Sequence, residues 1–250
     1  MVDIFPLPAF KDNYIWLLSK GRHAVIVDPG DASVVIKALE QHQLSLEAIL
    51  ITHHHADHID GVEALLAYQP GPVYAPRREH YSFAHQALQE GDIVELPGLD
   101  IALQVLEVPG HTLGHIAYYT DGLLFCGDTL FGAGCGRLFE GTPAQMHASL
   151  QRLANLPVTT HVYCTHEYTE HNIGFALRIE PDNLALRQRQ AQASALRSQG
   201  LPTLPSTIQL ELETNPFLRC DQPAIQRAAN IASTQPEAVF AAIRELRNHY

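Results

Sequence analysis

Five potential metal ligands stand within six consecutive positions of this sequence, directly after a predicted buried strand. Residues 52–58 read Thr-His-His-His-Ala-Asp-His. Side chains two positions apart share one face of an extended segment, so His53, His55 and Asp57 can point the same way. A turn at Asp57 would then direct His58 toward a second ion beside the first. So dense a set of imidazole and carboxylate groups predicts a metal-binding loop at a strand end.

Three further candidate ligands, His111, Asp128 and His166, each follow another predicted strand, in the segments PGHT, CGDT and CTHE. Loops at the ends of strands are where a rigid scaffold usually carries functional side chains. Each of the three, taken alone, also reads as an ordinary hydrogen-bonded loop residue. Asp57 likewise could simply cap a helix that begins near Ile59. The four segments together favour a single metal site.

The first two thirds of the chain alternates between short β-rich runs and helical patterns, as a layered α/β fold does. Helical spacing of apolar residues is found at 34–39 and over 143–153. The expected strands cover residues 14–18, 24–28, 48–51, 73–74, 101–108, 115–119, 123–126 and 161–164. We therefore expect a layered α/β domain over residues 1–170.

The last third of the chain loses the strand pattern. Ala, Arg, Gln and Glu, which favour helix, dominate after about residue 170. Helices are expected over residues 183–198, 223–232 and 236–247, with residues 200–206 as a connector. The last of them has Pro in its first turn and arginines near its C-terminal end, both favourable positions. A helical second domain is expected over residues 171–250.

Composition narrows the class of partner and the compartment. The formal net charge of −11 argues against nucleic acid and against an anionic membrane surface. The four cysteines form no C-x-x-C pair, so neither a disulfide framework nor a zinc ribbon is indicated, which fits a reducing compartment. No signal-peptide pattern and no apolar stretch of membrane-spanning length is present. We expect a cytoplasmic protein, most simply a monomer.

The motifs T-H-x-H-x-D-H, G-H-T-x-G-H and G-D, followed by a late His, resemble the metallo-β-lactamase superfamily over residues 1 to about 170. The resemblance implies a four-layer αββα sandwich, here followed by a C-terminal all-helical domain. It also implies a binuclear metal centre whose ligands are His53, His55 and His111 for one ion, Asp57, His58 and His166 for the other, and Asp128 as the bridge. His54 and His115 are not ligands in that scheme. We expect a structural role for His115 and assign none to His54.

Nitrogen and oxygen ligands without a thiolate suit Zn²⁺, Fe or Mn²⁺, and zinc is the expected ion. Two such ions can lower the pKa of a shared water toward ~7 and polarise a substrate carbonyl. The nucleophile is then solvent, with Asp57 and Asp128 as the expected catalytic carboxylates, and Cys135 and Cys164 need no catalytic role. A thioester fits this chemistry because its thiolate leaves without strong general-acid help.

Three segments resemble the glyoxalase II, or hydroxyacylglutathione hydrolase, family. They are GAGCGRLFEGT at 132–142, THEYT at 165–169 with Asn172 beyond it, and the closing RELR at 244–247. The resemblance implies that a small-molecule glutathione thioester, S-D-lactoylglutathione, is hydrolysed to D-lactate and glutathione. That reaction is the second step of methylglyoxal detoxification.

The same resemblance implies that six side chains bind the substrate: Arg137, Phe139, Tyr168, Asn172, Arg244 and Arg247. Arginine suits the task because its guanidinium binds a carboxylate through two parallel hydrogen bonds. Without the resemblance, Arg244 and Arg247 would read as the solvated face of the last helix. Phe139 replaces a frequent Tyr of the family and Arg137 a frequent Lys, changes that bear on affinity rather than on chemistry.

Other activities remain open at this point. A sulfur dioxygenase acting on glutathione persulfide uses one iron and would not need Asp57, His58 and His166. A phosphodiesterase or tRNA-processing nuclease should carry a basic surface, which the composition does not indicate. A metal-binding module without catalytic activity is a further alternative. Metal content separates these readings, since two ions favour the hydrolase, one iron the dioxygenase and none the interaction module.

Overall fold

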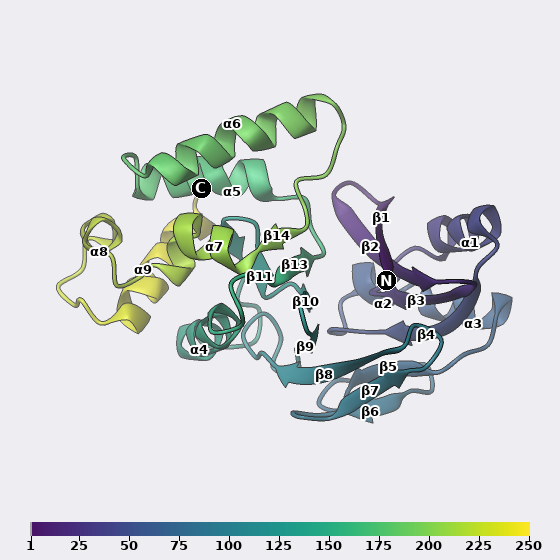
Figure 1. Cartoon of the computed structure of the whole chain (residues 1–250). Coiled ribbons are helices and arrows are strands. Elements are labelled where there is room, and N and C mark those ends of the chain that lie inside the picture. Colours follow the sequence, from purple (N-terminus) through teal and green to yellow (C-terminus); the bar gives the residue numbers. More distant parts are fainter. Residues whose placement is uncertain (1) are drawn as a thin grey trace. The chain divides into compact units, whose positions relative to one another are not determined.

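The computed structural model describes residues 2–250, which divide into two compact units. The first unit contains residues 2–107 together with Gly114–Gly127. The second contains Val108–Leu113 and Asp128–Tyr250. Figure 1 labels the helices and strands of both.

The first unit contains a six-stranded sheet in the order β1-β2-β3-β4-β5-β6. Its strands are β1 (Asp3–Ala9), β2 (Asn13–Lys20), β3 (His23–Val27), β4 (Ser45–Leu50), β5 (Val73–Pro76) and β6 (Gln86–Leu88). The first three strands pair antiparallel, and β3 to β6 pair parallel. The metal-binding segment predicted above follows β4, an inner strand of this sheet.

Both faces of this sheet are covered, because successive side chains of β2 and β3 point to opposite sides and nearly all are buried. One face packs against α1 (Ala32–His42) and α3 (Val62–Tyr68) in an apolar cluster that includes Leu17, Ile26, Leu39 and Leu65. Figure 1 shows these two helices beside the sheet. The strand ends that carry functional side chains therefore start from a tightly packed frame.

An antiparallel run of four strands completes the first unit. These are β7 (Ile93–Leu96), β8 (Ile101–Glu107), β9 (Ile116–Thr120) and β10 (Leu123–Gly127). The buried hydroxyl of Tyr118 on β9 donates hydrogen bonds to the carbonyls of Ile51 and Tyr74, at 2.8 and 3.2 Å. This contact ties the run to the ends of β4 and β5, so the first unit is layered as helix, sheet and sheet.

The second unit is mostly helical. It contains two short strand pairs, β11 (Leu130–Phe131) with β12 (Gly134–Cys135) and β13 (His161–Cys164) with β14 (Ser206–Thr207). Its helices are α4 (Pro143–Ala154), α5 (Thr169–Ile179), α6 (Leu184–Ser198), α7 (Ile208–Thr214), the 3-10 turn η1 (Pro216–Leu218), α8 (Pro223–Ala229) and α9 (Pro236–Asn248). Side-chain caps from Thr142, Asn183 and Thr207 fix where α4, α6 and α7 begin.

Most expected elements are confirmed, and the structure adds several that were not expected: β1, β6, β7, β11, β12, β14, α3, α5, α7 and η1. β1 was not expected, because Pro6 and Pro8 argue against a strand; it is an edge strand, where proline is tolerated. The 200–206 connector ends in the first residue of β14. α8 ends at Ala229, three residues early, because Asn230 adopts a left-handed conformation there. Asp57 lies on a helical turn, α2 (Ala56–Ile59), and not in an extended segment.

Within residues 2–250, no helix combines the length and the apolar character needed to cross a membrane.

Candidate active-site residues

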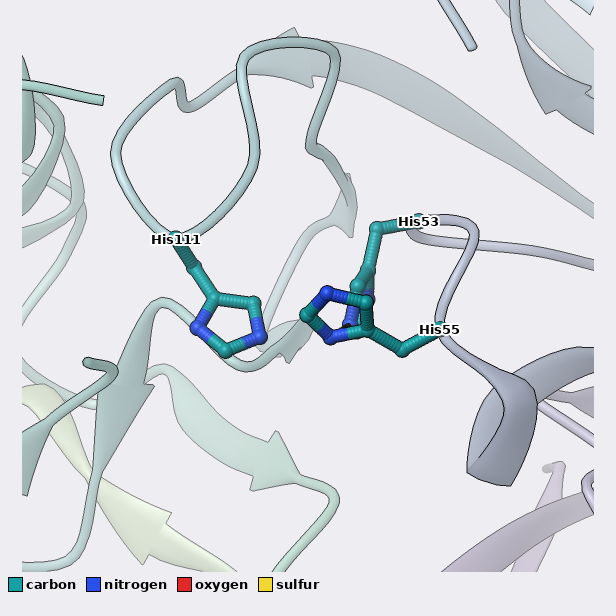
Figure 2. Close-up of side chains that lie close together, drawn as sticks. All are labelled: His53, His55 and His111. Atoms are coloured by element: carbon teal, nitrogen blue, oxygen red, sulfur yellow. Dashed lines mark hydrogen bonds between the residues drawn. The ribbon is translucent and has the colours of Figure 1, made fainter. Parts of the chain in front are cut away.

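His53 and His55 lie on the loop that joins β4 to α2. Figure 2 shows both rings, together with His111, which comes from the loop that follows β8. Nε2 of His53 is 3.0 Å from Nδ1 of His55, and the two rings meet edge to face. His53 is fully buried and His55 is half-buried. Two imidazoles therefore turn nitrogens toward one point, as expected from their spacing.

Asp57 and His58 are brought to the same place by the helical turn α2. The ring of His58 lies 4.0 Å from that of His53, and its Nε2 is 3.7 Å from Oδ2 of Asp57. The buried amide of Asn13 on β2 donates to the same Oδ2 at 2.9 Å. A Cβ at Gly30 would lie 2.0 Å from the carbonyl oxygen of Asp57, so only glycine allows this close approach.

Asp28, which directly follows β3, forms hydrogen bonds with two residues of the metal-binding segment, Thr52 and His58. Its carboxylate accepts hydrogen bonds from the backbone N–H and the hydroxyl of Thr52, at 2.8 and 2.7 Å, and lies 3.0 Å from Nδ1 of His58. Because the Thr52 hydroxyl donates its one hydrogen bond to Asp28, it accepts a hydrogen bond from Nδ1 of His53, 3.1 Å away. Both rings thus carry their proton on Nδ1 and leave Nε2 as the metal-binding atom.

The two remaining histidines of these motifs, His54 and His115, contact other side chains of the first unit. His115 is fully buried, and its ring stacks on that of His53 at 4.6 Å. Nδ1 of His54 is 3.3 Å from the buried carboxylate of Glu79, which also accepts a hydrogen bond from the hydroxyl of Tyr81 at 2.9 Å. His54, which had no role from sequence, therefore links the loop to a buried acidic group.

The second unit carries the other three candidate ligands. His111 and His166 each place Nε2 close to the same carboxylate oxygen, Oδ2 of Asp128, at 3.4 and 3.3 Å. All three side chains are buried. The backbone carbonyl of Arg137 accepts from Nδ1 of His111 at 2.8 Å, which leaves Nε2 of that ring for a metal. As predicted, each of the three follows a strand: β8, β10 and β13.

A pocket of about 280 Å³ lies beside two of these ligands within the second unit. Its lining residues are His111, Asp128, Phe131, Cys135, Arg137, Phe139, Tyr168, Asn172, Arg244 and Arg247. All six side chains expected to bind substrate thus border one pocket. Tyr168 stacks flat on His166 at 4.7 Å, and Phe139, 60% exposed, meets His111 edge to face at 5.2 Å.

Two arginines of α9 form one wall of the pocket. Arg244 is buried and donates to the carbonyl of Cys135 at 3.0 Å, and Arg247 donates to the amide oxygen of Asn172 at 3.1 Å. Burial, followed by the nearby charge of Arg244, lowers the pKa of Arg247. The alternative reading from sequence, in which α9 presents these arginines to solvent, is excluded for Arg244 because it is buried. Two cationic groups at one wall of the pocket make that wall suited to binding an anion.

The cysteines have no catalytic surroundings. All four are buried thiols that form no disulfide. Burial raises the pKa of Cys135, which lines the pocket, and raises that of Cys220 to about 12. Neither is a thiolate at neutral pH. The surroundings of Cys135 therefore agree with the prediction from sequence that it is not the nucleophile.

Comparisons with known proteins bear directly on this arrangement. The family model described as the metallo-beta-lactamase superfamily matches residues 10–166, and the one described as hydroxyacylglutathione hydrolase C-terminus matches residues 167–250. A hydroxyacylglutathione hydrolase from Methylobacillus flagellatus is 58% identical over 250 residues, 100% of both chains. The chain belongs to the hydroxyacylglutathione hydrolase family. The expected family is thereby confirmed.

The solved structure of BLEG-1 B3 metallo-beta-lactamase has a TM-score of 0.65 at 26% identity, over 88% of this chain and 100% of that one. ETHE1 from Myxococcus xanthus has a TM-score of 0.67 at 26% identity, over 99% of this chain and 98% of that one. TTHA1623 in a di-iron-bound form has a TM-score of 0.61 at 27% identity, over 86% of this chain and 100% of that one. The expected fold class, a metallo-β-lactamase α/β fold with a C-terminal helical region, is confirmed.

The donor set fits a divalent metal. Two ligand atoms on one tetrahedral ion, each about 2.0–2.1 Å from it, lie about 3.3 Å apart. The distances from Asp128 to the nitrogens of His111 and His166 agree with that value. The metallo-β-lactamase fold with its His and Asp cluster thus suggests divalent metal binding.

Sequence reasoning did not identify Asp28 and Asn13. Asp28 stands in the segment VDPG at a strand end, the same signal that identified Asp128, but the following Pro-Gly reads as a simple turn. Asn13, at the start of β2, carried no such signal.

Proposed function

We propose that the protein hydrolyses S-D-lactoylglutathione and related 2-hydroxyacyl glutathione thioesters to the hydroxy acid and glutathione, the second step of methylglyoxal detoxification. The observation that carries the proposal is the pocket of the second unit, where His111 and Asp128 share a lining with the six expected substrate-binding side chains. Relatives named hydroxyacylglutathione hydrolase, 51–58% identical over the full chain, support it.

The proposed centre holds two divalent ions, most simply Zn²⁺, with Fe or Mn²⁺ as alternatives. Its proposed ligands are His53, His55 and His111 for one ion, Asp57, His58 and His166 for the other, and Asp128 for both. Support comes from the near-equal distances of Asp128 Oδ2 from His111 and His166. The di-iron-bound form of TTHA1623, a protein of similar fold, also supports a centre of two ions.

When bound, two such ions supply a water ionised near neutral pH and a Lewis acid for the thioester carbonyl. The side chains of the protein do the positioning. Asn13 holds Oδ2 of Asp57 and so helps to fix the orientation of this carboxylate. Nδ1 of His58 donates a hydrogen bond to Asp28, and Nδ1 of His111 donates one to the carbonyl of Arg137, so both rings keep their proton on Nδ1 and offer Nε2 to a metal.

The pocket accounts for the glutathione part of the proposed substrate. Arg137 lies 6.0 Å from the ring of Phe139 and is exposed, so its guanidinium can reach a substrate carboxylate. Arg247 offers a second cation, while Arg244 supports the wall by binding Cys135. Tyr168 and Asn172 add polar groups at the same wall. Phe139 provides an apolar contact where a tyrosine would provide a hydroxyl.

We propose a functional division near residue 170, with the metal ligands before it and three of the six expected substrate-binding residues, Asn172, Arg244 and Arg247, after it. The family models change at residue 166, which supports this boundary. We also propose a cytoplasmic location, supported by four cysteines that form no disulfide. The expected monomer stays a prediction. The substrate is a small molecule, and the net charge of −11 argues against nucleic acid.

A steady-state assay against S-D-lactoylglutathione, a β-lactam, a lactone and glutathione persulfide tests the proposal, with metal content measured on the same sample. We expect turnover of the thioester alone and about two ions per chain. Oxygen consumption with the persulfide at one iron per chain would instead establish the dioxygenase. A sample with two ions per chain that leaves the thioester intact would overturn the proposal.

A further inference from the structure

Residues 128–137 of the second unit connect the metal-ligand candidates to the C-terminal helices. They begin at Asp128, form the hairpin of β11 and β12 around Gly132 and Ala133, and end at Arg137. The N–H of Gly136 donates to the carbonyl of Thr129 at 3.1 Å and closes the base of the hairpin. A Cβ at position 136 would lie 1.9 Å from the carbonyl oxygen of Asp128, so the base is tightly packed.

Every residue from Phe131 to Cys135 has a backbone group hydrogen-bonded to a buried side chain of the C-terminal region. The side-chain partners are Asn215 for the carbonyls of Phe131 and Gly134 (3.2 and 2.9 Å), Asn172 for that of Gly132 (3.0 Å), Glu211 for the N–H of Ala133 (2.8 Å) and Arg244 for the carbonyl of Cys135 (3.0 Å). Side chains, not a neighbouring strand, thus determine the shape of this hairpin.

Glu211 and Asn215 are the centre of this network, and neither is exposed. Glu211 accepts from Ala133, from Asn215 at 3.0 Å, from the hydroxyl of Ser206 and from Arg189. Both oxygens of this carboxylate accept hydrogen bonds, two each. A neutral amide in its place would therefore point its own N–H at another hydrogen-bond donor. The buried Arg189 donates also to Thr214 at 2.6 Å, which holds the ion pair in place.

Ala133 has a left-handed backbone, with φ of 52°, which a residue with a Cβ rarely adopts. A Cβ on Gly134 would lie 2.4 Å from the amide nitrogen of Asn172. The hairpin therefore adopts an unfavourable conformation against closely packed side chains. Such a conformation persists only where the surrounding structure determines it, and here the Glu211 network does so.

The hairpin in turn touches all three ligand candidates of its unit. Asp128 is its first residue, the backbone carbonyl of Arg137 at its end accepts a hydrogen bond from Nδ1 of His111, and the ring of Phe131 lies edge to face against His166 at 5.8 Å. A shift of the hairpin would move each of these contacts. The C-terminal helices thus have a physical connection to the metal ligands that does not pass through the substrate.

We propose that Glu211 and Asn215 are positioning residues that orient Asp128, His111 and His166 for metal binding through the 128–137 hairpin. The proposal rests on the proposed metal-dependent function and extends it, because the helical region then shapes the metal site as well as the glutathione wall. Neither residue itself lines the pocket, and the contact of Asn215 with the pocket residue Phe131 is made to the backbone of the hairpin.

The test compares Glu211→Gln and Asn215→Ala with Glu180→Gln. Glu180 is also buried and forms a bidentate ion pair with Arg219, at 3.0 Å for both contacts, but it does not contact the hairpin. It therefore reports the cost of losing a buried ion pair alone. Three quantities are measured on the full-length protein: Zn²⁺ affinity by competition with a chromophoric chelator, amide hydrogen exchange over residues 129–137 in the metal-free protein, and the thermal midpoint.

We expect Glu211→Gln and Asn215→Ala to weaken Zn²⁺ binding about tenfold or more and to speed exchange over 129–137 by a similar factor. Glu180→Gln should lower the midpoint and change neither quantity. Equal metal affinity and equal exchange in Glu211→Gln and Glu180→Gln would overturn the proposal. If Glu211→Gln fails to fold, Asn215→Ala decides on the same criteria.

These outcomes are separable from failure of the proposed function. A wild-type protein that binds Zn²⁺ but leaves the thioester intact removes the proposed substrate, while the affinity differences between the variants still decide the positioning. A wild-type protein that binds no metal overturns both.

Discussion

Asp28 shows how one buried carboxylate can fix the protonation of two neighbouring rings. It lies 3.0 Å from His58 Nδ1 and binds Thr52, which in turn faces His53. A neutral amide in its place would keep the shape and, because Asn tolerates a left-handed backbone, also the φ of 54° found here. The N–H of that amide would, however, point at a group that is itself a hydrogen-bond donor, such as Nδ1 of His58.

We therefore expect Asp28→Asn to weaken Zn²⁺ binding by about 10–100-fold, the usual effect of losing a hydrogen-bond partner of a metal-binding imidazole. Chelator competition measures it. Asp31→Asn is the matched control, since Asp31 caps α1 through Ser33 and asparagine caps equally well. Equal affinity in the two variants would remove the role given to Asp28.

At the residue scale, the sequence pointed to candidate ligands, whose metal binding stays a prediction, but not to the residues that hold them. His111, Asp128 and His166 could be identified because each follows a strand, and strand ends are visible as breaks in an apolar run. Glu211 and Asn215 could not, because they lie in a helical stretch and are separated from their hairpin partners by 78 to 84 positions. Only the fold creates such contacts.

Helix α9 shows at the element scale why a terminal helix can carry binding residues. Val239, Phe240 and Ile243 are fully buried, and the ring of Phe240 contacts that of Phe217 at 5.7 Å. This packing fixes the helix, so Arg244 and Arg247, one turn apart, present their guanidinium groups at the pocket. A charged group held this way binds an anion with little loss of side-chain freedom.

We expect Arg247→Ala to raise KM for S-D-lactoylglutathione about tenfold or more while kcat and metal content change little, because a hydrogen bond to a charged group contributes about 1.5–3 kcal/mol. Steady-state kinetics with metal analysis measures the split. Arg178→Ala is the control, since Arg178 lies over the same Tyr250 ring, at 5.3 Å against 5.7 Å, and does not line the pocket. A KM unchanged in both variants would exclude Arg247 from substrate binding.

Sequence pattern predicted most of the long elements, though not α5, and missed several short ones. The helix expected at 236–247 is present because Pro at its start and an apolar stripe agree. The four-residue α2 was missed because one turn cannot display a 3.6-residue period, and Asp57 was therefore placed on an extended segment. β1 was missed because two prolines outweighed its alternation. Short elements depend on tertiary contacts, such as Asn13 with Asp57.

For the whole molecule, the candidate ligands are divided between the two compact units, with four in the first and three in the second. If one binuclear centre uses all seven, as proposed, metal binding contributes to the stability of both units together. A ligand that binds only the native state at 100 times its Kd adds about 2.7 kcal/mol. For a chain of this size each kcal/mol raises the thermal midpoint by roughly 2–4 °C.

Removal of the metal with a chelator is therefore expected to lower the thermal midpoint by roughly 5–10 °C, and Zn²⁺ should restore it. Scanning calorimetry of the full-length protein measures the difference. Asp128→Ala should show a smaller rise with Zn²⁺, because the carboxylate oxygen near both His111 and His166 is gone. A midpoint that does not respond to Zn²⁺ in the wild type would contradict a centre shared by the two units, since a native-state ligand must stabilise what it binds.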